Sequence, residues 1–195
     1  MKTVRRLYFY AVAFISLEVV IWGLIGLLRS MVSAVITDTA QALAQALSLI
    51  LVGVHLTLSL ERSLEARLIA LTLAVGVVVE MVQIARGTYR FTSGTLVDVL
   101  PPPWLLGMWA QFATTFRFSL RPVITRPVLA ALFGAVGGPI AFLAGERLGA
   151  VTRLPPLTLG LLRLSISWAI ALVVLSVVVC RMTQDQDAAR YRALR

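Results

Sequence analysis

Six apolar blocks, each long enough to cross a bilayer, take up most of the 195-residue chain. A membrane-spanning α-helix needs about 20 mostly apolar residues, whereas a membrane β-barrel shows alternating segments of about ten. These blocks are too long and too continuous for a barrel. The sequence therefore predicts an all-α fold, a single polytopic membrane bundle with six transmembrane helices. The predicted spans are residues 7–28, 39–60, 67–85, 103–120, 127–148 and 157–180, followed by a tail over 181–195.

The charged residues predict how this bundle is oriented. Only 14% of the chain is charged, against about 25% in an ordinary soluble domain, and the net charge is +9. The basic residues lie in short loops and tails, so the positive-inside effect explains them and we expect no nucleic-acid partner. One set of loops and tails holds twelve Lys and Arg and the other holds five. This count predicts that both termini lie in the cytoplasm, with membrane lipids as partners.

The N-terminal apolar run has an alternative interpretation as a signal peptide. Lys2, Arg5 and Arg6 precede it, and residues 32–34 (Val-Ser-Ala) resemble a cleavage site. The run is about 22 residues long, however, against about 7–15 for a signal sequence, and it contains Glu18. We favour a retained helix, since cleavage would leave five helices and an external N-terminus.

The second predicted helix carries a polar face. Five polar side chains are separated by 4, 3, 7 and 4 residues, which places them on one side of a helix that should turn away from lipid. The face either lines a polar pathway or forms hydrogen bonds between helices. Its members are Gln41, Gln45, Ser48, His55 and Ser59, with Glu18 of the first helix as a further intramembrane polar residue.

Two ionisable residues lie at matching depths in the third and sixth spans. Glu80 is about five residues and Arg163 about six residues from the outer ends of their helices, about 8–9 Å below the boundary. A charge at the centre of a membrane helix costs about 2.5–3.5 kcal/mol, and pairing reduces this cost. We therefore predict a Glu80–Arg163 ion pair.

Small residues form a stripe along the fifth predicted helix, where another backbone can approach closely. Four of its five members are glycine. Pro139, in the middle of the stripe, should kink or locally open the helix. The stripe is either a packing seam within the chain or a surface for another membrane protein or a second copy. Its members are Gly134, Gly138, Ala141, Gly145 and Gly149.

The longest connection, residues 86–102, is predicted to be external. Either Arg86 and Arg90 meet lipid phosphate or an acidic substrate group, or the aromatic residues of the loop anchor the chain at the interface, and we favour anchoring. The loop also contains Asp98. The chain has one cysteine, Cys180, and one histidine, so we expect no metal site and no cofactor.

Several motifs occur in order over about 110 residues, from Glu65 to about Leu175. They are Pro-Trp-Leu-Leu-Gly-Met-Trp at 103–109, Phe-Ala-Thr-Thr at 112–115, Leu-Phe-Gly-Ala-Val-Gly-Gly-Pro at 132–139 and Ala-Gly-Glu-Arg-Leu-Gly-Ala at 144–150. This stretch resembles a bacterial inner-membrane family without an assigned activity, domain-of-unknown-function family 2878. The chain departs from the family with Glu80 in place of Asp and Phe142 in place of Tyr, and its first 30 residues resemble a different uncharacterised membrane family. The resemblance implies a small multi-helix membrane protein connected with lipid modification.

No complete catalytic, metal or nucleotide motif is present in the sequence. The polar face, the glycine stripe and the buried charges favour a non-enzymatic protein that binds, transports or scaffolds a small or lipidic molecule. One alternative is a membrane-embedded enzyme or an accessory factor of lipid modification, and another is a structural assembly subunit. An enzyme would need a nucleophile, an acid–base pair or a metal within reach, and no spacing assembles one.

Overall fold

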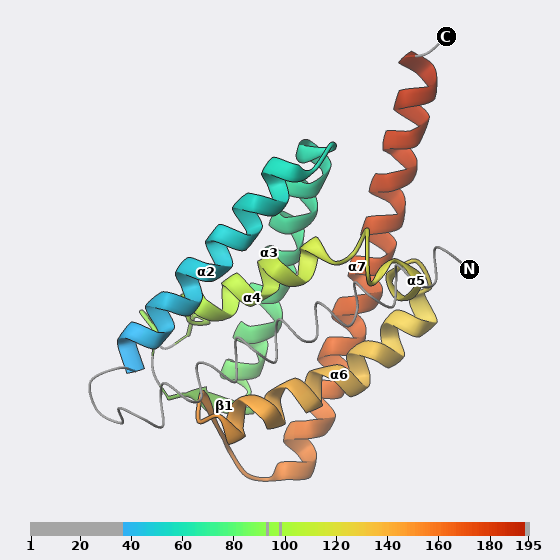
Figure 1. The fold of residues 1–195 in the computed structure, drawn as a ribbon. Coiled ribbons are helices and arrows are strands. Elements are labelled where there is room, and N and C mark those ends of the chain that lie inside the picture. Colours follow the sequence, from blue (N-terminus) through green and yellow to red (C-terminus); the bar gives the residue numbers. More distant parts are fainter. Residues whose placement is uncertain (1–36, 93, 98, 194–195) are drawn as a thin grey trace.

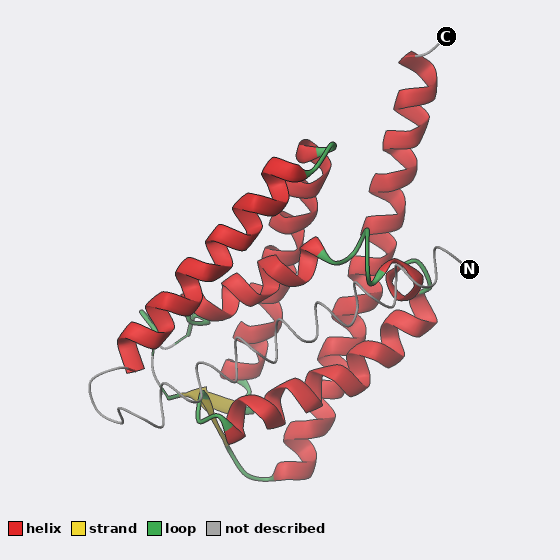
Figure 2. Ribbon diagram, viewed as in Figure 1, coloured by secondary structure: helices red, strands yellow, loops and turns green. Residues whose placement is uncertain are grey.

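The computed structural model describes residues 37–92, 94–97 and 99–193 (Figure 1). The predicted first helix, with Glu18, lies outside these residues. Within them the helical fold class is confirmed, and two three-residue strands are added (Figure 2). In chain order the elements are α2 (Thr37–Leu58), α3 (Arg62–Ala85), β1 (Tyr89–Phe91), α4 (Pro103–Thr114), α5 (Arg121–Ile124), α6 (Pro127–Arg147), β2 (Val151–Arg153) and α7 (Leu157–Ala193).

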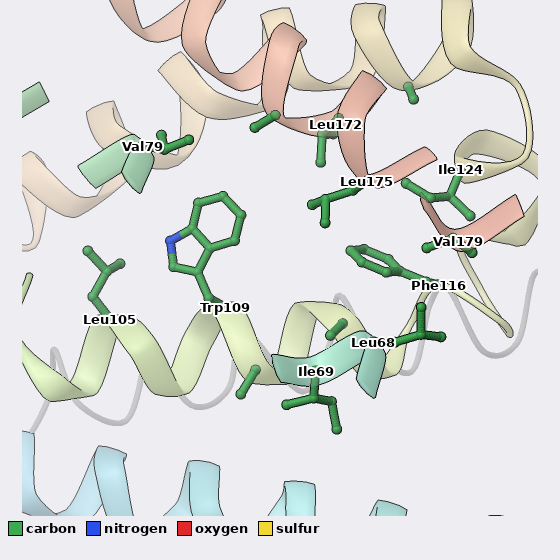
Figure 3. Close-up of a cluster of buried hydrophobic side chains, with 14 of the residues drawn as sticks. Leu68, Ile69, Val79, Leu105, Trp109, Phe116, Ile124, Leu172, Leu175 and Val179 are labelled. Carbon is green, nitrogen blue, oxygen red and sulfur yellow. The ribbon is translucent and has the colours of Figure 1, made fainter. Parts of the chain in front are cut away.

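The core lies where α3, α4 and α7 meet. Helix α6 lies along α7, while α2 packs chiefly on α4 (Figure 1). Trp109 of α4, Leu68 of α3 and Leu172 of α7 are almost completely buried in this core (Figure 3). In a bilayer such contacts stabilise the fold through close packing, because lipid is as apolar as the side chains that leave it.

Three helices are long and apolar enough to cross a membrane: α3, α6 and residues Leu157–Gln186 of α7. The apolar part of α2, Gln45–Leu58, is shorter. These helices expose aliphatic side chains, such as Leu58 (77% exposed) and Val128 (73%), while polar side chains lie inside. The chain therefore has the helices and the surface of a membrane protein.

Helix α4 is shorter than the predicted span over residues 103–120. It ends at Thr114, after 12 residues, and is about 18 Å long against a bilayer core of about 30 Å. The hydroxyl groups of Thr114 and Thr115 donate to the carbonyls three residues earlier, at 2.7 Å and 2.6 Å, and turns follow over residues 115–120. The periodicity of the apolar residues did not reveal this end.

Helix α4 and the turns after it together run from the C-terminal end of α3 to its N-terminal end. Near the start of α4, Trp104 contacts Phe91, which lies just beyond the C-terminal end of α3. After the helix, Arg117 reaches Glu65 in the first turns of α3. The chain thus passes from one end of the bundle to the other as a short helix followed by turns.

Helix α7 continues past the predicted end at Cys180 as far as Ala193, so the predicted tail over 181–195 is helical over most of its length. The strands were also missed by the sequence analysis, which predicted loops there. Strand β1 pairs antiparallel with β2, with Tyr89 opposite Arg153 and Phe91 opposite Val151. This pairing holds the loop after α3 against the α6–α7 connection.

Candidate functional site

A buried carboxyl group, that of Glu80 in α3, is the centre of the candidate site. Its side chain is completely buried. Oε2 accepts a hydrogen bond from the Tyr89 hydroxyl, and Oε1 accepts one from Nε1 of Trp109 at 3.2 Å. We call these three residues the Glu80 cluster. Both donors are neutral groups, so hydrogen bonds and not an ion pair satisfy the carboxyl oxygens.

Local structure explains how Trp109 reaches Glu80. Gly76 lies one helical turn before Glu80, on the same face of α3. A Cβ at Gly76 would lie 2.6 Å from Cγ of Trp109, so only glycine leaves room for the indole against the α3 backbone. The indole then stacks on Trp168 of α7, with ring centroids 4.7 Å apart, and this stacking fixes its orientation.

Tyr89 reaches the same carboxyl from the other side. Gly87, with a φ of 64°, turns the chain back after α3, and β1 then carries Tyr89 over the end of the helix. The Tyr89 ring packs against Phe142 of α6, with centroids 4.2 Å apart. Burial raises the pKa of the Tyr89 phenol well above its ordinary value, and the adjacent Glu80 carboxyl raises it further. The phenol therefore stays protonated and donates to Glu80.

Gln83 adds a second layer of buried hydrogen bonds, which the sequence analysis missed. Its side chain is completely buried. Nε2 donates to the Arg163 carbonyl at 3.1 Å and to Oγ of Ser167 at 2.8 Å, while Oε1 accepts from Oγ1 of Thr88 at 2.7 Å. The three-residue spacing from Glu80 was the available signal, because it places Gln83 on the same helix face.

The predicted ion pair between Glu80 and Arg163 does not form among the described residues. Nη1 of Arg163 donates instead to the Arg86 carbonyl at 2.9 Å. Carbonyls in the last turn of a helix lack an intrahelical partner, and a long arginine side chain extends toward the boundary to reach one. The matching depth of the two residues was thus insufficient to predict contact.

A second polar cluster lies at the opposite end of α3. Arg117 binds Glu61 and also donates to Oε1 of Glu65 at 2.8 Å. Oε2 of the same completely buried Glu65 lies 3.2 Å from Nε2 of His55. The Phe118 ring meets the imidazole edge-on at 5.7 Å. We call His55, Glu61, Glu65 and Arg117 the Arg117 cluster; the sequence analysis had singled out only its histidine.

The polar face of α2 turns toward α3 and α4 where the structure describes it. Ser48 is buried, and its Oγ accepts a hydrogen bond from Nε2 of Gln111 at 2.9 Å. Oγ of Ser59 accepts from the Glu61 amide at 3.2 Å. Gln45 is half-buried, and the Gln41 side chain lies outside the described atoms.

The members of the glycine stripe have different surroundings, and only two of them are shown against α7. Gly134 and Gly138 face Trp168 of α7, where an added Cβ would lie 2.7 Å from its backbone carbon and 2.6 Å from its Cδ1, respectively. Of the other members, Ala141 is exposed, Gly145 would meet only Val151 at an ordinary distance, and Gly149 forms a turn with a φ of 70°.

The charged residues of the predicted external loop have separate surroundings. Arg90 is exposed on β1, Arg86 contributes its carbonyl to Arg163, and Asp98 lies outside the described residues. Within the part of the chain that the structure describes, no group of three or more His, Cys, Asp or Glu residues could hold a metal ion.

Comparison with known protein families identifies the chain. Residues 30–174 match the family described as "Protein of unknown function (DUF2878)". The chain belongs to this family. The match confirms the resemblance and extends it to residue 30, so it includes both the Glu80 cluster and the Arg117 cluster. A search of curated proteins and a search of solved structures gave no match.

Proposed function

We propose that the chain is a multi-pass protein of the bacterial cytoplasmic membrane that binds, transports or scaffolds a small or lipidic molecule without catalysing a reaction. Both termini lie in the cytoplasm in this proposal, and all six apolar segments insert. The exposed aliphatic surface of α2, α3, α6 and α7 supports the location. The alternating chain directions of α3, the α4 segment, α6 and α7 support the topology (Figure 1).

The Glu80 cluster carries the proposal of a functional interior. An ionisable group within a membrane helix is costly, and such residues mark substrate or ion pathways more often than surface charges do. Packing alone would be satisfied by an apolar residue at this position. Yet α3 keeps a carboxyl there, with Gly76, Trp109 and Tyr89 arranged to accommodate it.

A lipidomic and metabolite comparison of cells with and without the gene tests the proposal. We expect one lipid class or small molecule to change in the deletion strain and to be restored by the wild-type gene. Glu80→Gln should restore it poorly, although this variant keeps an acceptor for one of the two donors. The matched control is Glu146→Gln, which alters a half-exposed carboxyl at the end of α6. An unchanged deletion strain, or full restoration by Glu80→Gln, would contradict the proposal.

The Arg117 cluster favours one alternative, a membrane-embedded enzyme of lipid modification. His55 would act as the general base, with Glu65 orienting the imidazole and Arg117 holding the carboxylate. His55→Gln separates the two functions. It should abolish the cellular effect if the protein is an enzyme and leave it largely intact if the interior site at Glu80 is the one that matters.

The third alternative, an assembly subunit, has less support from the described residues. The glycine stripe would be its partner surface, but α7 already covers Gly134 and Gly138. A partner would have only the remaining, exposed side of α6 to bind.

A further inference from the structure

We propose that three arginines around α5 bind the headgroup of an anionic phospholipid whose acyl chains lie on an exposed apolar ridge of α7. Arg121 begins α5, Arg126 precedes α6, and Arg181 lies on α7, and all three are exposed. Sγ of Cys180 lies 4.0 Å from the carbonyl oxygen of Thr125. This contact brings their respective neighbours, Arg181 and Arg126, to one part of the surface. We call the three residues the arginine triad.

The positive charge of the triad is not neutralised within the described part of the chain. None of its members forms a salt bridge there. Asp185 lies one helical turn after Arg181 on α7 and forms no salt bridge with it. Guanidinium groups match the geometry of phosphate oxygens and bind them through paired hydrogen bonds. The triad therefore attracts a phosphate group at the surface.

An apolar ridge on α7 ends at the triad. Its exposed side chains precede Arg181 at spacings of 4, 3 and 4 residues, which is one continuous face of a helix. The ridge and its arginine extend over about 16 Å. One leaflet of the hydrocarbon core is about 15 Å thick, half of about 30 Å. The ridge consists of Ile170, Val174 and Val177.

A similar ridge on α6 begins two residues after Arg126. Its exposed side chains recur every four residues and extend over about 18 Å, again close to the depth of one leaflet. Gly134 and Gly138 face α7, and helical spacing places this ridge on the opposite face of α6, so one lipid cannot cover both ridges. The α7 ridge, which ends at Arg181 on the same helix face, matches a phospholipid, and free phosphate would use only the basic end. The α6 ridge consists of Val128, Leu132, Val136 and Ile140.

Native mass spectrometry of the full chain in detergent micelles tests the inference with two lipids of identical acyl chains, phosphatidylglycerol and phosphatidylcholine. We expect wild-type protein to retain phosphatidylglycerol preferentially. The double variant Arg126→Gln/Arg181→Gln should bind it about 25-fold more weakly, from about 1 kcal/mol, or five-fold, per arginine. The control, Arg90→Gln/Arg147→Gln, removes the same charge from exposed positions outside the triad and should bind as wild type does.

Three outcomes would overturn the inference. One is equal retention of both lipids by the wild type, and another is an equal loss of binding in both double variants, which would indicate general charge attraction. The third is competition by glycerol phosphate, which lacks acyl chains, at the same concentration as the lipid. The inference rests on the membrane location in the proposed function. Failure to enter micelles or bilayers at all would refute that location, whereas entry without lipid preference would refute only the triad site.

Discussion

Replacing Gly134 by alanine should separate α6 from α7. A Cβ at this position would lie 2.7 Å from the carbonyl carbon of Trp168 and 3.0 Å from the amide nitrogen of Ala169. Both are backbone atoms, so no rotamer change can relieve the contact, and the helices must move apart by about 1 Å to reach ordinary van der Waals distance. Overpacking of this kind costs about 1–3 kcal/mol.

Gly137 provides a matched control in the same helix. An added Cβ there meets nothing within 4 Å. Alanine at this position should therefore be neutral or stabilise the helix by about 0.5–1 kcal/mol, since glycine is the poorer helix former. The two substitutions make the same chemical change, and we expect their free energies of unfolding to differ by about 1–4 kcal/mol.

Thermal unfolding in detergent, followed by far-ultraviolet circular dichroism, measures this difference. With about 2–4 °C per kcal/mol for a chain of this size, Gly134→Ala should melt at least about 2 °C below Gly137→Ala. Size-exclusion chromatography of both variants before heating checks that they begin folded. If Gly134→Ala melted at the same temperature as Gly137→Ala or above it, the close approach of α6 and α7 would be refuted.

Four further predictions concern the buried polar groups. Tyr89→Phe leaves an oxygen of Glu80 without its donor and should cost about 1–3 kcal/mol in thermal unfolding; no loss would argue against the contact. Burial raises the pKa of the Tyr89 phenol in the folded protein. The contribution of the phenol to stability is therefore fully present below pH of about 10, the ordinary pKa, and is lost as pH rises through the higher pKa of the folded state. The absorbance of the phenolate measures this ionisation. Glu80→Arg combined with Arg163→Glu should melt no higher than Glu80→Arg alone, because the two residues are not paired; rescue by the double change would restore the ion-pair hypothesis. Glu65→Ala should lower the melting temperature by removing a buried acceptor of Arg117, and an unchanged melting temperature would contradict that bond.

The long apolar helices were predictable because their signals are local. The uninterrupted apolar runs of α3, α6 and α7, with Pro127 at the start of one of them, indicated helices that the structure contains and that are long and apolar enough to cross a membrane. The end of α4 was less predictable, since the apolar sequence continues beyond Thr114 while the helix gives way to turns. The strands escaped detection because three residues are too few for a recognisable alternating pattern, and their pairing joins distant parts of the chain.

The need of Glu80 for polar partners could be predicted, but the identity of those partners could not. A carboxyl in an apolar run stands out in any sequence, because its cost in lipid demands an explanation. Its hydrogen-bond donors, Tyr89 and Trp109, lie 9 and 29 residues away in the chain. The Gly87 turn brings Tyr89 to Glu80, and the space beside Gly76 admits Trp109. Neither feature produces a recognisable pattern in the sequence.

The sequence by itself determined the class of this protein: apolar helices, a basic set of loops, and a few polar residues where polarity is costly. Composition and helical periodicity suffice for these features, because each depends on one residue and its near neighbours. The tertiary structure alone decided that Glu80 is held by neutral donors and that Arg163 bonds to a helix end. It also decided that Arg117 joins two glutamates of α3. Partner choice depends on helix rotation and close packing, which a linear pattern does not contain.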